Sequence, residues 1–136
     1  MMTSALPGGV KISNDDPEYS FKYVSEHFAQ MLGYDTPEEL MEASGGTIVD
    51  LAHPDDLEQG IAQALEQYSK ADHYEITYRM KCKNGSWKYI EDRGHKIRKP
   101  DGMIEHWNLI LDQNELVEKT IALESEKKAN QSKSDF

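Results

Sequence analysis

The chain has 136 residues, a length that suits one domain with one modest core, and a formal net charge of -10. That charge argues against a general nucleic-acid binder and against direct membrane contact, because nucleic acids and anionic lipids both require a basic surface. The single cysteine, Cys82, excludes an internal disulfide, and there is neither a leader peptide nor an apolar run near the roughly 20 residues of a membrane span.

The N-terminal part predicts a β-hairpin that follows a short lead-in of residues 1–6. Residues 8–13 and 21–24 alternate between apolar and polar side chains, as half-buried strands do. Asn14-Asp15-Asp16-Pro17 lies between them and is a cluster of turn residues. We therefore expect two short paired strands at the start of the domain.

The pattern then changes to helical spacing, with three helix starts. Ser25 is a suitable N-cap for a helix that ends near Gly33, and Thr36-Pro37-Glu38-Glu39 combines an N-cap, a proline in the first turn and a capping-box glutamate. His53-Pro54-Asp55-Asp56 opens the longest helix of the globular part, which we expect to run to Tyr68. Its two aspartates would face the positive end of the helix dipole.

Residues 74–111 predict a three-stranded meander. Apolar and polar side chains alternate strictly from Tyr74 to Lys83, and Asn84-Gly85 is the preferred two-residue hairpin turn. In this alternation Arg79 points away from Tyr78 and would pair with an acidic neighbour such as Glu91. Together with the N-terminal hairpin, the meander predicts an α+β fold, a five-stranded antiparallel sheet with the helices on one face.

From Glu115 to Phe136 the chain predicts a separate C-terminal helix. Leu116, Thr120 and Leu123 share one stripe of this helix, which has no domain of its own to pack on, so another helix is its natural partner. We therefore expect a parallel homodimer, while a frayed terminal helix is the alternative. Residues 128–136 resemble the segment that enters the dimerisation helix of a sensor histidine kinase, just before its phosphate-accepting histidine.

Eight short sequence words between residue 7 and about residue 114 occur in the order seen in PAS domains of sensor kinases and cyclases, and the chain resembles that family. The words are Pro7-Gly8-Gly9-Val10, Tyr23-Val24-Ser25, Met31-Leu32-Gly33-Tyr34, Thr36-Pro37-Glu38-Glu39, His53-Pro54-Asp55-Asp56, Tyr78-Arg79-Met80, Lys83-Asn84-Gly85-Ser86-Trp87 and Asp92-Arg93-Gly94. The family usually closes with Asp-Ile-Thr, and this chain has Asp112-Gln113-Asn114 instead. The resemblance implies a PAS fold over residues 7–114 with a signalling helix over residues 115–136.

The resemblance also implies a cavity between helices and sheet, and such a cleft is the default ligand site. Candidate pocket residues are those with a shared helical or alternating phase: Phe28, Met31, Leu32, Leu51, Ile61, Leu65, Tyr74, Tyr78, Met80 and Trp107. All of these except Tyr74 and Trp107 are also expected to form the core between the helices and the sheet. Candidate relay residues lie at the junction with the last helix and along its stripe: Asp112, Asn114, Leu116, Thr120 and Leu123.

No motif for a cofactor is evident in the sequence, so the expected ligand is an unknown small molecule. Light-sensing relatives carry their flavin-reactive cysteine on a helix, whereas Cys82 ends a strand, and haem-binding relatives have a histidine on the long helix, where residues 57–68 have none. A metal site is not expected either, because His53, Asp55 and Asp56 lack a second nitrogen or sulfur ligand.

The function expected from these observations is that of a cytoplasmic sensory input module from a bacterial sensor histidine kinase of a two-component system. The module would not be an enzyme itself; its partners would be a second copy and the downstream kinase domain. The input domain of a diguanylate cyclase is the alternative within the same class. A small metal-dependent enzyme that uses His53, Asp55 and Asp56 is the alternative of another class.

Overall fold

The computed structural model describes the backbone of residues 8–134, and the side chains of residues 8–114 and 120–128. Its elements in chain order are β1 (Gly9–Asn14), β2 (Phe21–Val24), α1 (Glu26–Met31), α2 (Pro37–Ala43), α3 (Ile48–Leu51), α4 (Pro54–Tyr68), β3 (His73–Lys81), β4 (Trp87–Arg98), β5 (Ile104–Asp112) and α5 (Gln113–Ser134). The lead-in of residues 1–6 lies outside the described residues, and α5 begins two residues before the predicted Glu115.

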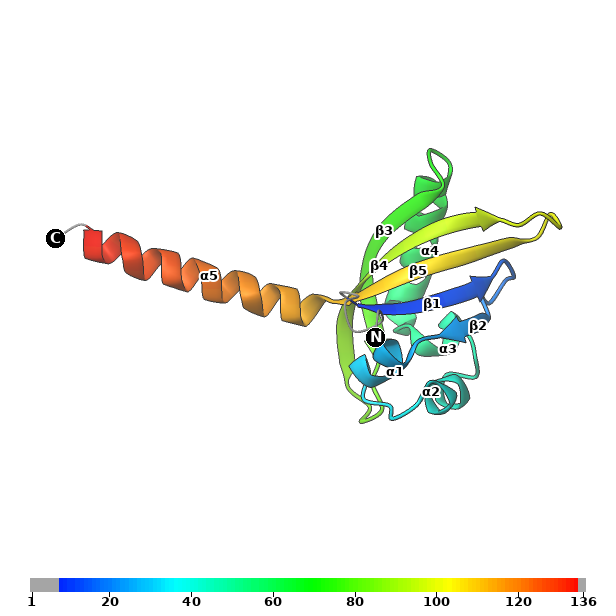
Figure 1. Cartoon of the computed structure of the whole chain (residues 1–136), viewed down its shortest axis with the longest axis horizontal. Coiled ribbons are helices and arrows are strands. Elements are labelled where there is room, and N and C mark those ends of the chain that lie inside the picture. Colours follow the sequence, from blue (N-terminus) through cyan, green and yellow to red (C-terminus); the bar gives the residue numbers. More distant parts are fainter. Residues whose placement is uncertain (1–7, 135–136) are drawn as a thin grey trace.

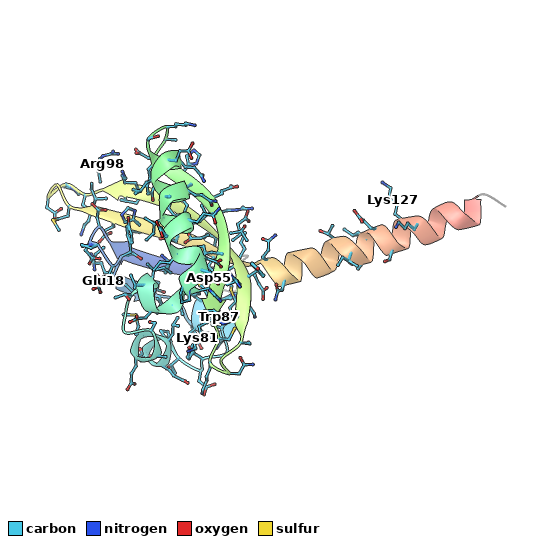
Figure 2. All side chains as sticks on the ribbon, turned by 180° about the vertical axis from the view of Figure 1, so that it is seen from behind. Glu18, Asp55, Lys81, Trp87, Arg98 and Lys127 are labelled. Atoms are coloured by element: carbon cyan, nitrogen blue, oxygen red, sulfur yellow. The ribbon has the colours of Figure 1, made fainter. Side chains whose placement is uncertain are left out.

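The five strands form one antiparallel sheet in the order β2-β1-β5-β4-β3. The helices α1 to α4 gather on one side of it, while α5 projects away from the domain (Figure 1). Figure 2, seen from behind, shows α4 lying across the sheet. The predicted α+β architecture is therefore confirmed, and β5, at the centre of the sheet, leads directly into α5.

The predicted helix starts are confirmed by their caps. The side chains of Ser25 and Thr36 accept hydrogen bonds from Phe28 N and Glu39 N at 3.2 Å and 3.1 Å. His53 caps α4, because its Nδ1 accepts from Asp55 N at 3.0 Å. Each cap satisfies a backbone N–H that the helix itself leaves without a partner.

The turn between β3 and β4 differs from the predicted two-residue hairpin. Cys82 N donates to Ser86 O at 2.8 Å, so three residues, Lys83, Asn84 and Gly85, form the loop. Gly85 has a φ of +88°, the left-handed conformation that three-residue hairpin loops require at this position. The Asn-Gly pair predicted the turn correctly, but the longer loop uses its glycine as the last residue.

The core lies between the sheet and helices α1 to α3. Phe28, Leu32, Leu51 and Met80 are fully buried there, as predicted. Met31 and Ile61 are only partly buried, and Leu65, which shares their predicted role, is 55% exposed. The prediction for Leu65 as a core residue was wrong, because helical spacing identifies a face of α4 but not how far the sheet extends beneath it.

Candidate functional site

A cavity of about 100 Å³ lies between α4 and the sheet. The wall formed by α4 is mostly apolar and consists of Leu57, Gly60, Ile61, Ala64 and Leu65. None of the 15 residues of α4 is buried, although this face is turned toward the sheet. The helix therefore covers a hollow space instead of closing onto a packed core.

The opposite wall, which is the sheet, is polar. Side chains from β1, β3, β4 and β5 line it, and most are buried: Lys11, Ser13, Tyr74, Tyr78, Asp92 and Asn108. In the sheet register Lys11 is the direct partner of Asn108, and Asn108 is the partner of Gly94. This polar floor is built from neighbouring strands, so its side chains are held on rigid elements.

Asp92 lies at the centre of the floor, and only 2% of this residue is exposed to solvent. It accepts hydrogen bonds from Tyr78 Oη at 2.7 Å, from Tyr74 Oη at 3.4 Å and from Asn108 Nδ2 at 2.7 Å. Such donors are what a buried carboxylate requires, because burial without partners is costly. Burial, with the nearby Asp92 charge as the second cause, raises the pKa values of Tyr74 and Tyr78 well above the ordinary range.

Gly94 makes this arrangement possible. A Cβ at residue 94 would lie 2.4 Å from Tyr74 Cζ and 2.8 Å from Asn108 Nδ2, both far closer than real contacts. The missing side chain therefore leaves the space in which Tyr74 and Asn108 meet, with Asn108 Nδ2 donating to Tyr74 Oη at 2.6 Å.

A second group of aromatic and charged side chains lies on the solvent side of the cavity, where Asp15 and Leu65 are exposed. His106 Nε2 lies 2.9 Å from Asp15 Oδ1, and its Nδ1 lies 3.1 Å from Tyr68 Oη. Lys96 places its ammonium 4.6 Å from the centre of the Tyr68 ring. Burial raises the pKa of Tyr68, so its hydroxyl stays protonated and available as a donor.

The predicted pocket residues divide into three groups. Ile61, Leu65, Tyr74 and Tyr78 line the cavity, whereas Phe28, Leu32, Leu51 and Met80 belong to the core, and Met31 packs against that core. Trp107 was predicted wrongly: it is 45% exposed and lies on the other face of the sheet, because its neighbours His106 and Asn108 are those that line the cavity.

Sequence reasoning missed the polar floor. Lys11, Asp92 and Asn108 are of types that are usually exposed, so alternation alone suggested a solvated face. The signal that could have found Asp92 is its phase, because it shares the face of Ile90, two residues before it and fully buried.

Residues 21–111 match the PAS fold family. The chain belongs to the PAS fold family. The methyl sulfide methyltransferase-associated sensor of Methanosarcina acetivorans is 31% identical to the chain, with 76% of the chain and 12% of that sensor covered. The PAS domain therefore spans a small part of this curated relative.

Two solved structures share the fold of this PAS domain. A sensory box histidine kinase/response regulator from Burkholderia thailandensis superposes with a TM-score of 0.57 at 23% identity, over 94% of this chain and 95% of that one. The N-terminal domain of a diguanylate cyclase with PAS/PAC sensor from Marinobacter aquaeolei gives a TM-score of 0.54 at 19% identity, over 77% and 94% of the two chains.

The junction between the PAS domain and α5 is held by Lys88. Its ammonium lies 3.1 Å from Asp112 Oδ2 and donates to the backbone oxygen of Met31 at 2.7 Å. The end of α1 and the start of α5 are thus tied to one side chain of β4. Of the other predicted relay residues, Asn114, Thr120 and Leu123 are exposed, and the side chain of Leu116 lies outside the described residues.

The residues proposed for other chemistries have structural partners. Arg79 was predicted to pair with Glu91. Instead it forms a bidentate ion pair with Asp56, with both contacts at 2.8 Å. Because α4 crosses the sheet beside β3, Asp56 reaches Arg79, and Glu91 pairs with Arg93 instead. Cys82 is buried after β3 and is not part of the cavity lining.

No group of three or more His, Cys, Asp or Glu side chains among the described residues is arranged to hold a metal ion. None of the helices described is both long and apolar enough to cross a membrane.

Proposed function

We propose that this PAS domain is the sensory input module of a larger signalling protein, and that its signal is a small ligand bound beneath α4. The observation that carries the proposal is the cavity itself, with an apolar helix wall and a polar floor of buried side chains. A mostly apolar cleft with a few converging polar groups is the usual form of a small-molecule site.

The route from this cavity to the outgoing helix is short. Asn108 lines the cavity, and four residues later β5 ends at Asp112, where α5 follows at once. A ligand that binds one packing of α4 and the sheet more tightly than another shifts the balance between them by that difference in affinity. In this proposal Lys88 couples the shift to the start of α5, through its ion pair with Asp112.

A sensor histidine kinase of a bacterial two-component system is the parent protein we propose, with this fragment as a cytoplasmic, non-enzymatic homodimeric module ahead of the kinase domain. The resemblance of residues 128–136 to a kinase entry segment supports it, as does the fold shared with the Burkholderia kinase. The fold shared with the Marinobacter protein supports a diguanylate cyclase as the alternative.

The next dozen codons of the parent gene separate these two parents. A histidine within a continuing helical pattern supports the kinase, and its absence favours the cyclase. The metal-dependent enzyme is the weaker alternative, because both carboxylate oxygens of Asp56 bind Arg79 and His53 caps α4.

Native mass spectrometry of freshly purified protein tests the ligand proposal directly. We expect a bound mass that is lost on denaturation, and a colourless solution, since no haem-binding or flavin-adduct motif is present. Ala64→Leu extends the apolar wall into the cavity and should abolish the added mass. Equal added mass in the wild type and in this variant would place the ligand elsewhere.

A further inference from the structure

The floor of the cavity carries two groups whose hydrogen-bonding capacity is not filled. The Lys11 ammonium can donate three hydrogen bonds, and the structure shows one, to Ser13 Oγ at 3.2 Å. Both amide hydrogens of Asn108 are used by Asp92 and Tyr74, while its Oδ1 has no partner among the described residues. Lys11 and Asn108 are each 3% exposed.

These two groups are neighbours. Lys11 on β1 and Asn108 on β5 are directly opposite each other in the antiparallel register, and both line the cavity. Side chains in such pairs are separated by about 5 Å at Cβ. The floor therefore offers a positively charged donor and a neutral acceptor on neighbouring residues of the cavity lining.

The unfilled donors of the lining favour a ligand with an anionic acceptor at this place. Every carboxylate of the lining already has hydrogen-bond partners: Asp92 has three neutral donors, Asp56 binds Arg79 and Asp15 contacts His106. The lysines of the lining contact no carboxylate, because in the described part of the chain neither Lys11 nor Lys96 forms an ion pair. Burial lowers the pKa of Lys11, with the Asp92 charge opposing the shift, so a further anion beside the ammonium would stabilise its charged form.

The size of the cavity limits the ligand. An engineered apolar cavity of about 150 Å³ accommodates benzene. The cavity of this chain is smaller, at about 100 Å³, but it opens to solvent beside Asp15 and Leu65. It therefore suits a molecule of roughly six heavy atoms or fewer, part of which can lie at the opening. Leu57, Ile61 and Ala64 of the opposite wall favour a short aliphatic part on that side.

We propose that the cavity binds a short 2-hydroxycarboxylate, with its carboxylate on the Lys11 ammonium and its hydroxyl donating to Asn108 Oδ1. The small alkyl end lies against α4. The proposal rests on the ligand-sensing function proposed above and assigns the chemical class of the ligand.

Three probes of similar size test the class: L-lactate, propionate, which lacks the hydroxyl, and 1,2-propanediol, which lacks the carboxylate. Binding is measured by calorimetry in a buffer free of carboxylates, at constant ionic strength. We expect lactate to bind at least about tenfold more tightly than propanediol, because a charge-assisted hydrogen bond is lost with the diol. Propionate should bind several-fold more weakly than lactate.

Two variants locate the effect. Lys11→Met removes the buried charge and keeps a similar stem, so the preference for lactate over propanediol should disappear. Lys81→Met is the matched control, because it removes the same charge from an exposed side chain at the end of β3 and should keep the preference. A preference that survives in the Lys11 variant overturns the assignment.

A measurement on the wild-type protein covers the case in which Lys11→Met does not fold. Titration with lactate should shift the NMR signals of the Asn108 side-chain amide and of Lys11 Cε. Shifts absent from both groups overturn the proposal. Propanediol that binds as tightly as lactate also overturns the carboxylate class, but it leaves the proposed ligand-sensing function in place. If all three probes fail to bind and the native mass spectrum shows no added mass, both the ligand class and the ligand-sensing function are overturned.

Discussion

At the scale of single residues, the candidate site depends on polar side chains that are buried in the cavity floor and hydrogen-bonded to one another. Asp92, Asn108 and Tyr74 form one buried hydrogen-bonded unit, in which Asn108 Oδ1 is left without a partner among the described residues. Each side chain is positioned by its hydrogen bonds to the others, so a substitution that displaces one of them should disturb the whole unit.

Gly94→Ala should destabilise the domain by about 1–3 kcal/mol, as overpacking of a filled interior does. The new Cβ would meet the Tyr74 ring at 2.4 Å and displace it from Asn108. Urea unfolding followed by tryptophan fluorescence measures the change in the free energy of unfolding. An unchanged midpoint would mean that the ring of Tyr74 moves aside at no cost, contrary to this account.

The ion pair between Asp56 and Arg79 makes a prediction about acid. Hydrogen bonds from Arg79 lower the pKa of Asp56 from 3.8 to about 2 in the folded protein. Because the folded-state pKa lies below the unfolded one, the pair stabilises fully above about pH 4, and its contribution is lost as the pH falls toward 2. The wild type should therefore be more stable than Asp56→Asn at pH 7, and the difference should shrink below about pH 4.

Chemical denaturation at a series of pH values measures that difference. Asp55→Asn is the matched control, since it removes the same charge one residue earlier from a side chain that is 81% exposed. Its stability should stay nearly parallel to that of the wild type. A constant gap between wild type and Asp56→Asn from pH 7 to pH 2 would show that the ion pair adds nothing.

At the scale of elements, α4 shows what a sequence pattern can and cannot say. Its start was predictable, because His53 and Pro54 act within one turn of the chain. The depth of its burial was not, because Leu57, Ile61 and Leu65 show the same periodicity whether they meet a packed sheet or a cavity. Periodicity reports which face is apolar, and only the tertiary structure decides what that face meets.

Local sequence patterns predict strands and helix starts, but they do not predict which side chains meet in a site, so the strands were predicted better than the site. Alternation in β3 and the caps of α1 and α2 are local signals, and the structure confirms them. In β1, however, alternation does not say which phase meets the cavity: Lys11 and Ser13 line it, whereas the apolar Val10 and Ile12 do not. The polar phase faces inward here, since the cavity, rather than a packed core, lies above it.

Replacing Gly60 of α4 with alanine should stabilise the domain, whereas the same replacement at Gly94 should destabilise it. A Cβ at residue 60 would have Ile76 Cδ1 at 3.9 Å as its nearest neighbour, an ordinary contact, and Gly60 lines the cavity. Gly60→Ala should therefore raise stability by roughly 0.5–1 kcal/mol through helix propensity. It should at the same time weaken ligand binding by narrowing the cavity.

Thermal melts of Gly60→Ala with and without ligand separate the two effects. The free variant should melt above the free wild type, and the ligand-induced shift should be smaller in the variant. A variant that is stabilised and binds normally would mean that the ligand does not use the part of the cavity beside Gly60.

At the scale of the whole molecule, two apolar surfaces have no partner within the described domain. Tyr23 and Trp107 are 49% and 45% exposed, and Trp107 lies on the sheet face away from the cavity. On α5, Ile121 and Leu123 are 59% and 66% exposed, while Lys127 projects into solvent far from the domain (Figure 2). Side chains of this size are costly to leave in water, which favours a second copy of the chain as their cover.

We therefore expect a parallel homodimer in which the α5 helices pair or each packs on the sheet of the other copy. The helix has 22 residues, which gives roughly 33 Å of length at 1.5 Å per residue. Two short heptads are marginal on their own, so the affinity between two copies of this chain should be weak. Sedimentation at several concentrations should show association of the whole chain.

A chain ended at Asn114 is the decisive comparison, because it keeps the sheet face and removes nearly all of α5. If the helices pair with each other or dock on the partner's sheet, this shortened chain should stay monomeric at concentrations where the whole chain is dimeric. Equal association of both chains would assign the dimer to the sheet face around Trp107 alone. If both stay monomeric well into the high micromolar range, α5 is not a dimer element here, and the relay from the cavity through β5 and Asp112 would have to act within one chain.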